Sequence, residues 1–223
     1  MAELKNEEQL KLALKEYTGL LDNVTGRELS WDKCFEVVSK AREDRPINEE
    51  DYIDYLCLHL AWFLASWGML RNSFLMNYNH TVHKNVVELI LKEDFDKLVG
   101  VSCKGFSECT TKFNELVEGI RDSYPDGCKP SDTLVSKILL GTMGCTPAFD
   151  TYFDKALKEC EITPKSFNST TIEQFGQIIT ALKCDELVEL KKHYPEMKIV
   201  DMAMWQRGYD IESEEKANIA IKK

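Results

Sequence analysis

The segment over residues 51–76 restricts the fold of this chain more than any other. Its sequence, DYIDYLCLHLAWFLASWGMLRNSFLM, predicts one long helix with apolar residues on almost every side. Such a helix has to be buried all round, because it offers no polar face to water. We therefore predict an all-α fold, a compact multi-helix domain around this long buried central helix.

Apolar residues at helical spacing recur through the rest of the chain, without strand-like alternation or a fixed repeat. A first amphipathic helix is expected over residues 3–21. Ser30 and Ser131 are placed to cap two later helices, because their hydroxyls can accept hydrogen bonds from free N–H groups of a first turn. The C-terminal half is expected to form helical hairpins.

The clearest loop is YPDGCKP, residues 124–130, which holds two prolines and a glycine. It separates a predicted N-terminal lobe, residues 1–124, from a predicted C-terminal lobe, residues 131–208. One continuous domain is the alternative. Residues 209–223 form a polar tail of helix-forming composition with little to bury, so we expect it to fray or to serve in a contact.

Composition and charge favour a cytoplasmic protein that does not depend on nucleic acid. The net charge is −10, from 38 acidic and 28 basic side chains, which disfavours a protein whose main affinity comes from neutralising phosphates. Eight cysteines without a C-x-x-C pair indicate free thiols in a reducing compartment. The first residues lack the apolar core of a signal peptide, and charges within residues 51–76 disfavour a membrane span.

Polar residues inside the predicted central helix are the best indication of a site. Arg71 and Asn72 follow Trp67 by one helical turn, and buried polar groups need partners. An arginine beside a tryptophan can hold an anion while the indole ring stacks on a planar group. We predict a ligand cleft lined by Trp67, Arg71, Asn72 and Trp205. The alternative is that Arg71 pairs with an internal carboxylate and that Trp67 is core packing.

Three other residues carry side chains that can bind a metal or act as a nucleophile. His80 and His83 stand one helical turn apart, but no further ligand completes a zinc set at a familiar spacing, so no metal site is predicted. Cys145 follows Gly144 and could lie near the positive end of a helix that begins around Pro147, where a thiolate is stabilised. A buried inert thiol is the more common role for such a cysteine.

Lys137 and Asp150 flank a turn predicted over residues 141–144. They could act as an amine and a carboxylate in one site, or form a salt bridge, or lie on the surface.

Two segments carry a resemblance to a known family. TLVSKILLGTMGCTPAFDTYF, residues 133–153, and KIVDMAMW, residues 198–205, resemble the C-terminal part of uncharacterised bacterial and phage proteins distantly similar to helix-hairpin-helix DNA glycosylases. The resemblance implies a helical-hairpin architecture. It also implies a nucleic-acid role in which the turn contacts a DNA phosphate through backbone N–H groups.

That implied site would consist of Gly141 and Gly144 at the phosphate, with Lys137 or Asp150 near the chemistry. The sequence departs from the family pattern, since these glycines are three apart instead of two and Lys137 precedes the turn. Pro147 also removes a backbone donor. The resemblance therefore supports the architecture more than the glycosylase activity.

Taken together, these observations predict a non-catalytic cytoplasmic binding protein, bacterial or phage encoded. Its ligand is expected to be a small anionic or nucleotide-like molecule or a protein partner, without a cofactor. One alternative is a nucleic-acid-binding protein or DNA glycosylase-like enzyme. Another is a structural subunit of an oligomer, in which apolar helices pack against a second chain.

Overall fold

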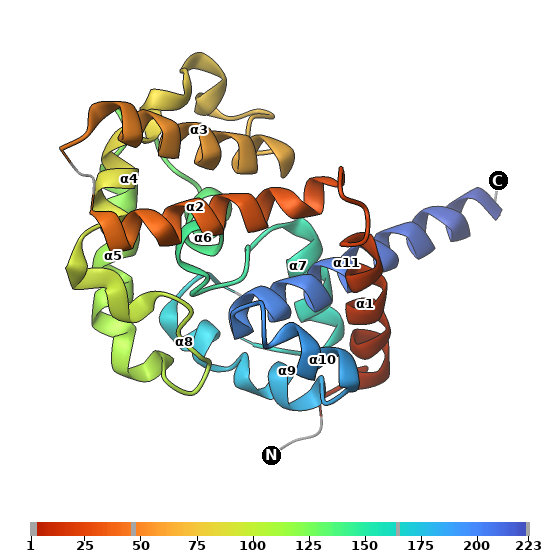
Figure 1. Ribbon diagram of the computed structural model, residues 1–223. Coiled ribbons are helices and arrows are strands. Elements are labelled where there is room, and N and C mark those ends of the chain that lie inside the picture. Colours follow the sequence, from red (N-terminus) through yellow and green to blue (C-terminus); the bar gives the residue numbers. More distant parts are fainter. Residues whose placement is uncertain (1–3, 46–47, 164–165, 222–223) are drawn as a thin grey trace.

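Helices make up the regular structure of the residues that the computed structural model describes, 4–45, 48–163 and 166–221 (Figure 1). Strands are absent from these ranges, so the all-α class is confirmed. The α-helices are α1 (Glu7–Leu20), α2 (Ser30–Asp44), α3 (Glu50–Ser66), α4 (Lys84–Ile90), α5 (Thr110–Asp122), α6 (Asp132–Met143), α7 (Thr151–Glu159), α8 (Ser169–Glu173), α9 (Gly176–Ala181), α10 (Asp185–Leu190) and α11 (Glu196–Ile221). The 3₁₀ helices are η1 (Arg27–Leu29), η2 (Phe74–Asn77), η3 (His80–His83), η4 (Glu93–Leu98) and η5 (Phe106–Cys109).

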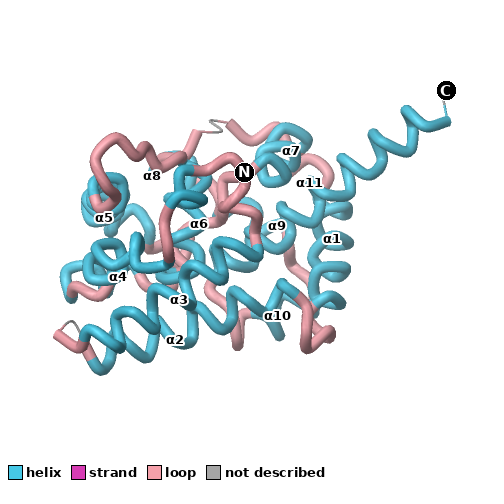
Figure 2. The backbone as a smooth tube through the Cα atoms, turned by 90° about the horizontal axis from the view of Figure 1, so that it is seen from above, coloured by secondary structure: helices cyan, strands magenta, loops and turns pink. Residues whose placement is uncertain are grey.

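The helix buried on all sides is α6, where each residue from 134 to 143 is buried. Helices α2, α3 and α5 contact it, and α2 and α3 also pack against each other (Figure 2). The prediction that α3 is buried all round is wrong, because Tyr55, Leu58 and Trp62 form an exposed stripe on it. Ser131 caps α6 as predicted, its hydroxyl accepting from the Leu134 N–H at 3.2 Å.

Helix α3 also ends earlier than predicted. Trp67 is its last flanking residue, and Gly68 takes the left-handed conformation with φ of 76°. The Met69 N–H then bonds to the Leu64 carbonyl at 2.9 Å, which closes the helix in the way glycine-terminated helices commonly end. A glycine is a stop signal for a helix, but apolar residues continue on both sides of Gly68, so the apolar pattern alone does not show where α3 ends.

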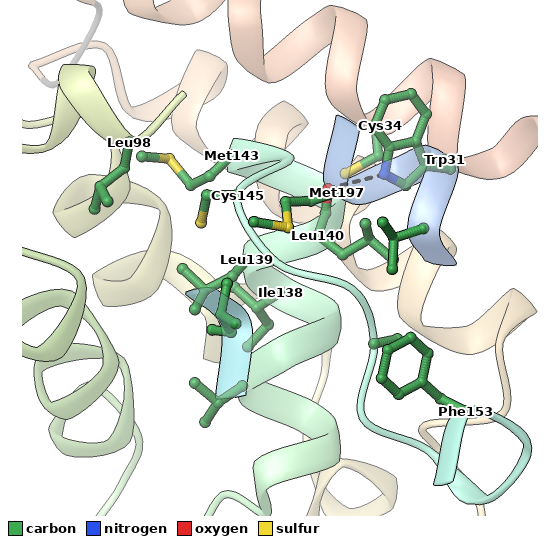
Figure 3. Packing of buried hydrophobic residues seen from close by; sticks show 14 of the residues in the cluster. Trp31, Cys34, Leu98, Ile138, Leu139, Leu140, Met143, Cys145, Phe153 and Met197 are labelled. Carbon is green, nitrogen blue, oxygen red and sulfur yellow. Dashed lines mark hydrogen bonds between the residues drawn. The ribbon is translucent and has the colours of Figure 1, made fainter. Parts of the chain in front are cut away.

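Buried side chains from both predicted lobes belong to one hydrophobic cluster (Figure 3). Within it, the indole N–H of Trp31 on α2 donates to the Leu140 carbonyl on α6 at 2.8 Å. Gly144 ends α6 with φ of 61°, and a side chain there would meet Pro195 at 2.8 Å. The prediction of a turn over residues 141–144 is therefore wrong, because α6 continues through Gly141 to Met143 and ends at Gly144.

Helix α11 packs between α1 and α7 and then continues beyond the body of the protein (Figures 1 and 2). Its 26 residues include most of the predicted tail, which is helical through Ile221 rather than frayed. Lys155 on α7 supports this extension by ion pairs with Glu212 and Glu215 at 3.4 and 2.7 Å. No helix in the part of the chain that the structure describes is long and apolar enough to cross a membrane.

Gly208 allows α11 to approach α7 closely. A Cβ atom at this position would lie 1.9 Å from the Tyr152 carbonyl oxygen, which is backbone and cannot turn aside. We expect Gly208→Ala to lower the free energy of unfolding by about 3 kcal/mol, because the two helices would have to separate. Urea unfolding followed by circular dichroism measures this change.

The matched control is Gly19→Ala on α1, where an added Cβ meets nothing within 4 Å. This variant should gain about 0.5 kcal/mol, because alanine favours the helix more than glycine does. Equal effects of the two substitutions would contradict the close approach at Gly208.

His83 is buried in the contact between η3 and the end of the α5 segment. Its Nδ1 lies 2.9 Å from the Tyr124 hydroxyl, and the two rings meet edge to face. Burial lowers the pKa of His83 from 6.5 to about 4, with a smaller contribution from His80. His80 itself pairs with Asp54 at 2.7 Å.

Between pH 6.5 and about 4, the unfolded chain binds a proton at His83 that the folded protein does not bind. Stability should therefore fall as pH falls through this window. We expect wild type to lose about 2 kcal/mol more than His83→Gln between pH of about 7 and about 4.5, measured by urea unfolding. Equal losses in both proteins would show that His83 is not the titrating group.

Candidate functional site

A pocket of about 650 Å³ opens where the end of α3, η1 and the starts of α6 and α7 meet α11. Its walls bring together side chains that are distant in sequence. The lining residues are Arg27, Ala65, Ser66, Trp67, Gly68, Met69, Leu70, Arg71, Thr133, Lys137, Asp150, Thr151, Tyr152, Trp205 and Glu212. The pocket thus includes residues from both of the sites that the sequence predicted separately.

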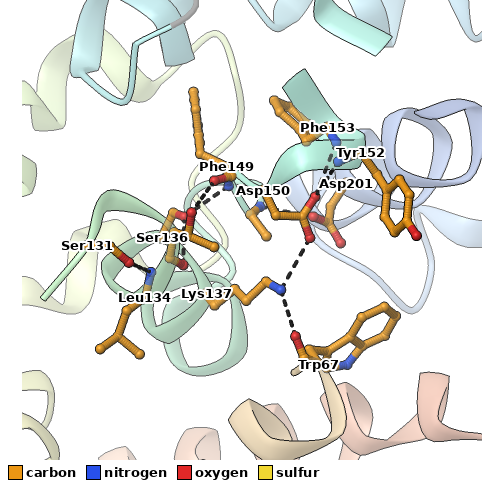
Figure 4. Close-up of polar contacts among 12 residues, drawn as sticks. Trp67, Ser131, Leu134, Ser136, Lys137, Phe149, Asp150, Tyr152, Phe153 and Asp201 are labelled. Carbon is orange, nitrogen blue, oxygen red and sulfur yellow. Dashed lines mark hydrogen bonds and ion pairs between the residues drawn. The ribbon is translucent and has the colours of Figure 1, made fainter. Parts of the chain in front are cut away.

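Lys137 extends from the buried helix α6 towards the pocket (Figure 4). Its ammonium group donates to the Trp67 carbonyl at 3.0 Å and pairs with Asp150 Oδ2 at 3.2 Å. The Lys137 side chain is only 6 % exposed, so it lies deep in the pocket wall rather than at the rim. Lys137 and Asp150 thus form a salt bridge, which is one of the three arrangements that the sequence allowed.

Asp150 has a second role at the start of α7. Its Oδ1 atom accepts from the backbone N–H groups of Tyr152 and Phe153 at 3.1 and 3.2 Å. This is the N-cap arrangement, which satisfies free donors of the first helical turn. One carboxylate therefore fixes both the beginning of α7 and the position of Lys137.

Three aromatic rings form another part of the wall. Trp205 meets Trp67 and Tyr152 edge to face, with ring centroids 5.3 Å apart in each pair. The guanidinium of Arg27 lies 5.0 Å from the Trp67 centroid and 5.4 Å from the Trp205 centroid. Arg27 also contacts Glu28 at 3.3 Å. The pocket therefore already holds a planar cation against two indole rings.

Arg71 lines the pocket but is exposed, so the predicted buried cation is wrong. The reason is the end of α3 at Gly68, which places Arg71 in an irregular segment instead of on a buried helix face. Arg71 forms no ion pair with any described residue. Asn72, with φ of 54°, is exposed and does not line the pocket.

A second Lys–Asp pair lies beneath the first. Lys198 and Asp201 on α11 are 3.1 Å apart and almost fully buried. Asp201 Oδ1 also accepts from the Ala148 N–H at 2.9 Å, which holds the loop that leads to Asp150. Lys198 lies 5.8 Å from the Trp67 ring, so this indole contacts cations of both the pocket and the core.

The surroundings shift the pKa of both members of this inner pair upwards. Burial acts to lower the pKa of Lys198, but Tyr17 and Asp201 outweigh it and the pKa is raised. Burial raises the pKa of the Asp201 carboxyl, against the opposing effect of Lys198, and the nearby charge of Asp150 raises it further. The two carboxylates are therefore close enough to influence each other.

The residues that the family resemblance singled out do not all gather here. Gly141 is pressed against the Phe63 ring, and Gly144 is buried with its N–H bonded to the Leu139 carbonyl at 2.9 Å. Neither glycine lines the pocket. In this conformation the Gly144 N–H is not accessible to a phosphate on the surface.

Cys145 and the two histidines also lie outside the pocket. Burial raises the pKa of Cys145 to about 12, so the thiol stays protonated. Pro147 precedes α7 instead of entering it, since that helix begins at Thr151. No group of three or more potential metal ligands occurs within the described ranges.

Sequence reasoning missed four contributors to the site: Arg27, Tyr152, Lys198 and Asp201. A signal was available for the last two. They stand three residues apart inside the otherwise apolar stretch 197–205, and a charged pair at that spacing indicates a buried contact. Arg27 lies in the short 3₁₀ helix η1 before α2, and only the folded chain brings it to Trp67.

Comparisons with models of protein families, with curated proteins and with solved structures found no match for this chain.

The inner pair makes a prediction about stability. Lys198→Met should lower the free energy of unfolding by about 3 to 5 kcal/mol, because it leaves Asp201 buried without its counter-charge. The double variant Lys198→Met/Asp201→Asn should recover most of that loss, since asparagine is neutral and still accepts from Ala148. Urea unfolding of both variants near neutral pH tests the pair, and a double variant no more stable than the single one would contradict it.

Proposed function

We propose that this protein is a non-catalytic binding protein for a small anionic, nucleotide-like molecule. The observation that carries the proposal is the pocket of about 650 Å³ in which two guanidinium groups and three aromatic rings face one space. Volumes of this order are typical of small-molecule sites. A planar ring joined to a phosphate or carboxylate would match both groups of residues, the ring matching the aromatic side chains and the anion matching the guanidinium groups.

The charges in the pocket favour an anion. Lys137 is already paired with Asp150, and Glu212 pairs with Lys155 and Lys216. Among the described residues, Arg27 has its chain neighbour Glu28 as its one ion-pair partner, at 3.3 Å, and Arg71 is exposed. Two guanidinium groups thus remain for a ligand in a protein of net charge −10, and a guanidinium can bind phosphate or carboxylate through two hydrogen bonds.

The rings favour a planar group next to that anion. Arg27 shows that a flat cation is accommodated within 5.4 Å of both indole centroids. A nucleobase can stack on an indole or on the outer face of the guanidinium itself. About half of the Arg27 side chain is exposed, so its outer face is available to a ligand.

Removal of Arg71 should weaken binding of the anion without affecting the fold. We expect Arg71→Ala to reduce the affinity for adenosine 5′-monophosphate about tenfold, because one charge-assisted contact is lost. Isothermal titration calorimetry measures the affinity, and circular dichroism checks the helix content. Since Arg71 is exposed, loss of the fold is not expected.

Arg121→Ala is the matched control. Arg121 pairs with Glu118 and Asp132 at 2.8 and 2.6 Å and does not line the pocket. This variant should bind the nucleotide as wild type does. If wild type binds no mononucleotide, or if both variants lose affinity equally, the proposed ligand class is wrong.

A nucleic-acid role is the second candidate function. It is favoured by one observation, that Lys137 and Asp150 lie together in the wall of a pocket with stacking aromatic rings. The net charge of −10 weighs against it. Affinity for DNA that falls steeply with added salt would support this role, and no DNA binding at low salt would exclude it.

An oligomer remains a prediction on separate grounds. The exposed stripe of Tyr55, Leu58 and Trp62 on α3 is an apolar surface of the kind found at interfaces. Mass measurement in solution distinguishes a monomer from an oligomer without reference to any ligand.

A further inference from the structure

A small chamber lies behind the pocket, between the two Lys–Asp pairs. All four charged residues line it. Its volume of about 10 Å³, counted as the space that the centre of a water molecule can occupy, is enough for one water molecule. Trp67 and Trp205 line both the chamber and the pocket, as do Lys137 and Asp150. The chamber is therefore an inward continuation of the candidate ligand site.

The lysines have hydrogen-bonding capacity left for this space. Each ammonium group has three N–H donors. Lys137 uses two, towards the Trp67 carbonyl at 3.0 Å and Asp150 at 3.2 Å. Lys198 uses two, towards Asp201 at 3.1 Å and the Tyr17 hydroxyl at 3.4 Å. Counted over the described residues, one donor of each lysine still needs an acceptor.

The carboxylates likewise have acceptor capacity left. Each carboxylate oxygen can accept about two hydrogen bonds. Asp150 Oδ2 has Lys137 as its partner, and Asp201 Oδ2 has Lys198. Buried polar groups are rarely left unsatisfied, because each unmet bond costs desolvation energy. The chamber is thus bordered by donors and acceptors that one common occupant could satisfy.

The charge of the cluster decides which occupant fits. With both Lys–Asp ion pairs formed, two ammonium groups and two carboxylates sum to zero, so a further buried ion in the chamber would have no counter-charge. A hydroxyl group is neutral, is small enough, and both donates and accepts. We propose that the chamber is a binding site for a single hydroxyl group, supplied by water in the free protein and by the ligand in the complex.

This inference rests in part on the proposed function and makes it more specific. A ligand with its ring at Trp67 and Trp205 and its anion at Arg71 would place a hydroxyl between the Lys–Asp pairs. A nucleotide has such hydroxyls on its sugar. The ligand class is accordingly a hydroxylated planar anion, and a plain aromatic acid would leave the chamber to water.

The water half of the proposal is tested without any ligand. A high-resolution crystal structure of the free protein should show one water within hydrogen-bond distance of a lysine Nζ and an aspartate oxygen of the chamber. A chamber without solvent density would overturn the proposal.

The ligand half is tested by comparing adenosine 5′-monophosphate with its 2′,3′-dideoxy analogue on wild-type protein. We expect the analogue to bind at least about tenfold more weakly, because it leaves the chamber groups without their partner. Equal affinities would overturn the ligand assignment. If neither compound binds, both the proposed function and the assignment of a ligand hydroxyl to the chamber are wrong. The crystal structure of the free protein alone decides the water site.

A variant in which a larger side chain fills the chamber tests where the hydroxyl binds. Ala148 lines the chamber and donates to Asp201 through its backbone N–H, so Ala148→Val adds two methyl groups while keeping that hydrogen bond. This variant should bind both nucleotides with the affinity that wild type has for the dideoxy compound. Ala61→Val on α3 lines neither space and should preserve the difference. A difference that survives in Ala148→Val would contradict the location of the hydroxyl.

Discussion

The ammonium group of Lys137 joins three helices at one point. It projects from α6, the helix that is buried on every side. It donates a hydrogen bond to the carbonyl of Trp67, directly after α3, and pairs with Asp150 at the start of α7. The same carboxylate caps α7, which in turn packs along α11. The position of the pocket therefore depends on a charge held in the interior of the protein.

Such an arrangement is not the most stable use of these positions. Two charges removed from water lose several kcal/mol of hydration, and well-packed apolar residues of similar volume are often equal or better for stability. This chain contains two such pairs side by side, one on α6 and α7 and one within α11. Both pairs lie at the inner end of the open pocket, where the proposed function would use their charges.

The sequence predicted the class of fold and several members of the site, but it divided that site between two hypotheses. Trp67 and Trp205 were assigned to a ligand cleft, and Lys137 and Asp150 to a nucleic-acid role, whereas the folded chain places all four in one wall. Periodicity identifies which residues face inward, yet it does not show which inward faces meet. That depends on long-range packing between α3, α6 and α11.

The errors have specific physical causes. The apolar residues of α3 and α6 look alike in sequence, and only the packing shows that α6 takes the centre while Trp62 faces solvent. The predicted position of Arg71 is wrong because apolar residues continue past Gly68, whereas the helix ends there. Arg27 could not have been predicted, since nothing in the sequence around η1 indicates that this side chain reaches two indole rings.

The contact at Gly208 has a consequence for how this pocket could adapt to its contents. Tyr152 and Trp205, which belong to the wall, come from two helices whose backbones are already in contact there, so these helices form one rigid side. The facing side consists of residues 68–71, which lie outside any helix and are half-buried at Gly68 and Met69 and exposed at Leu70 and Arg71. Molecules of different size would thus be accommodated by movement of one wall against a fixed one, and selectivity for shape would reside in the fixed wall.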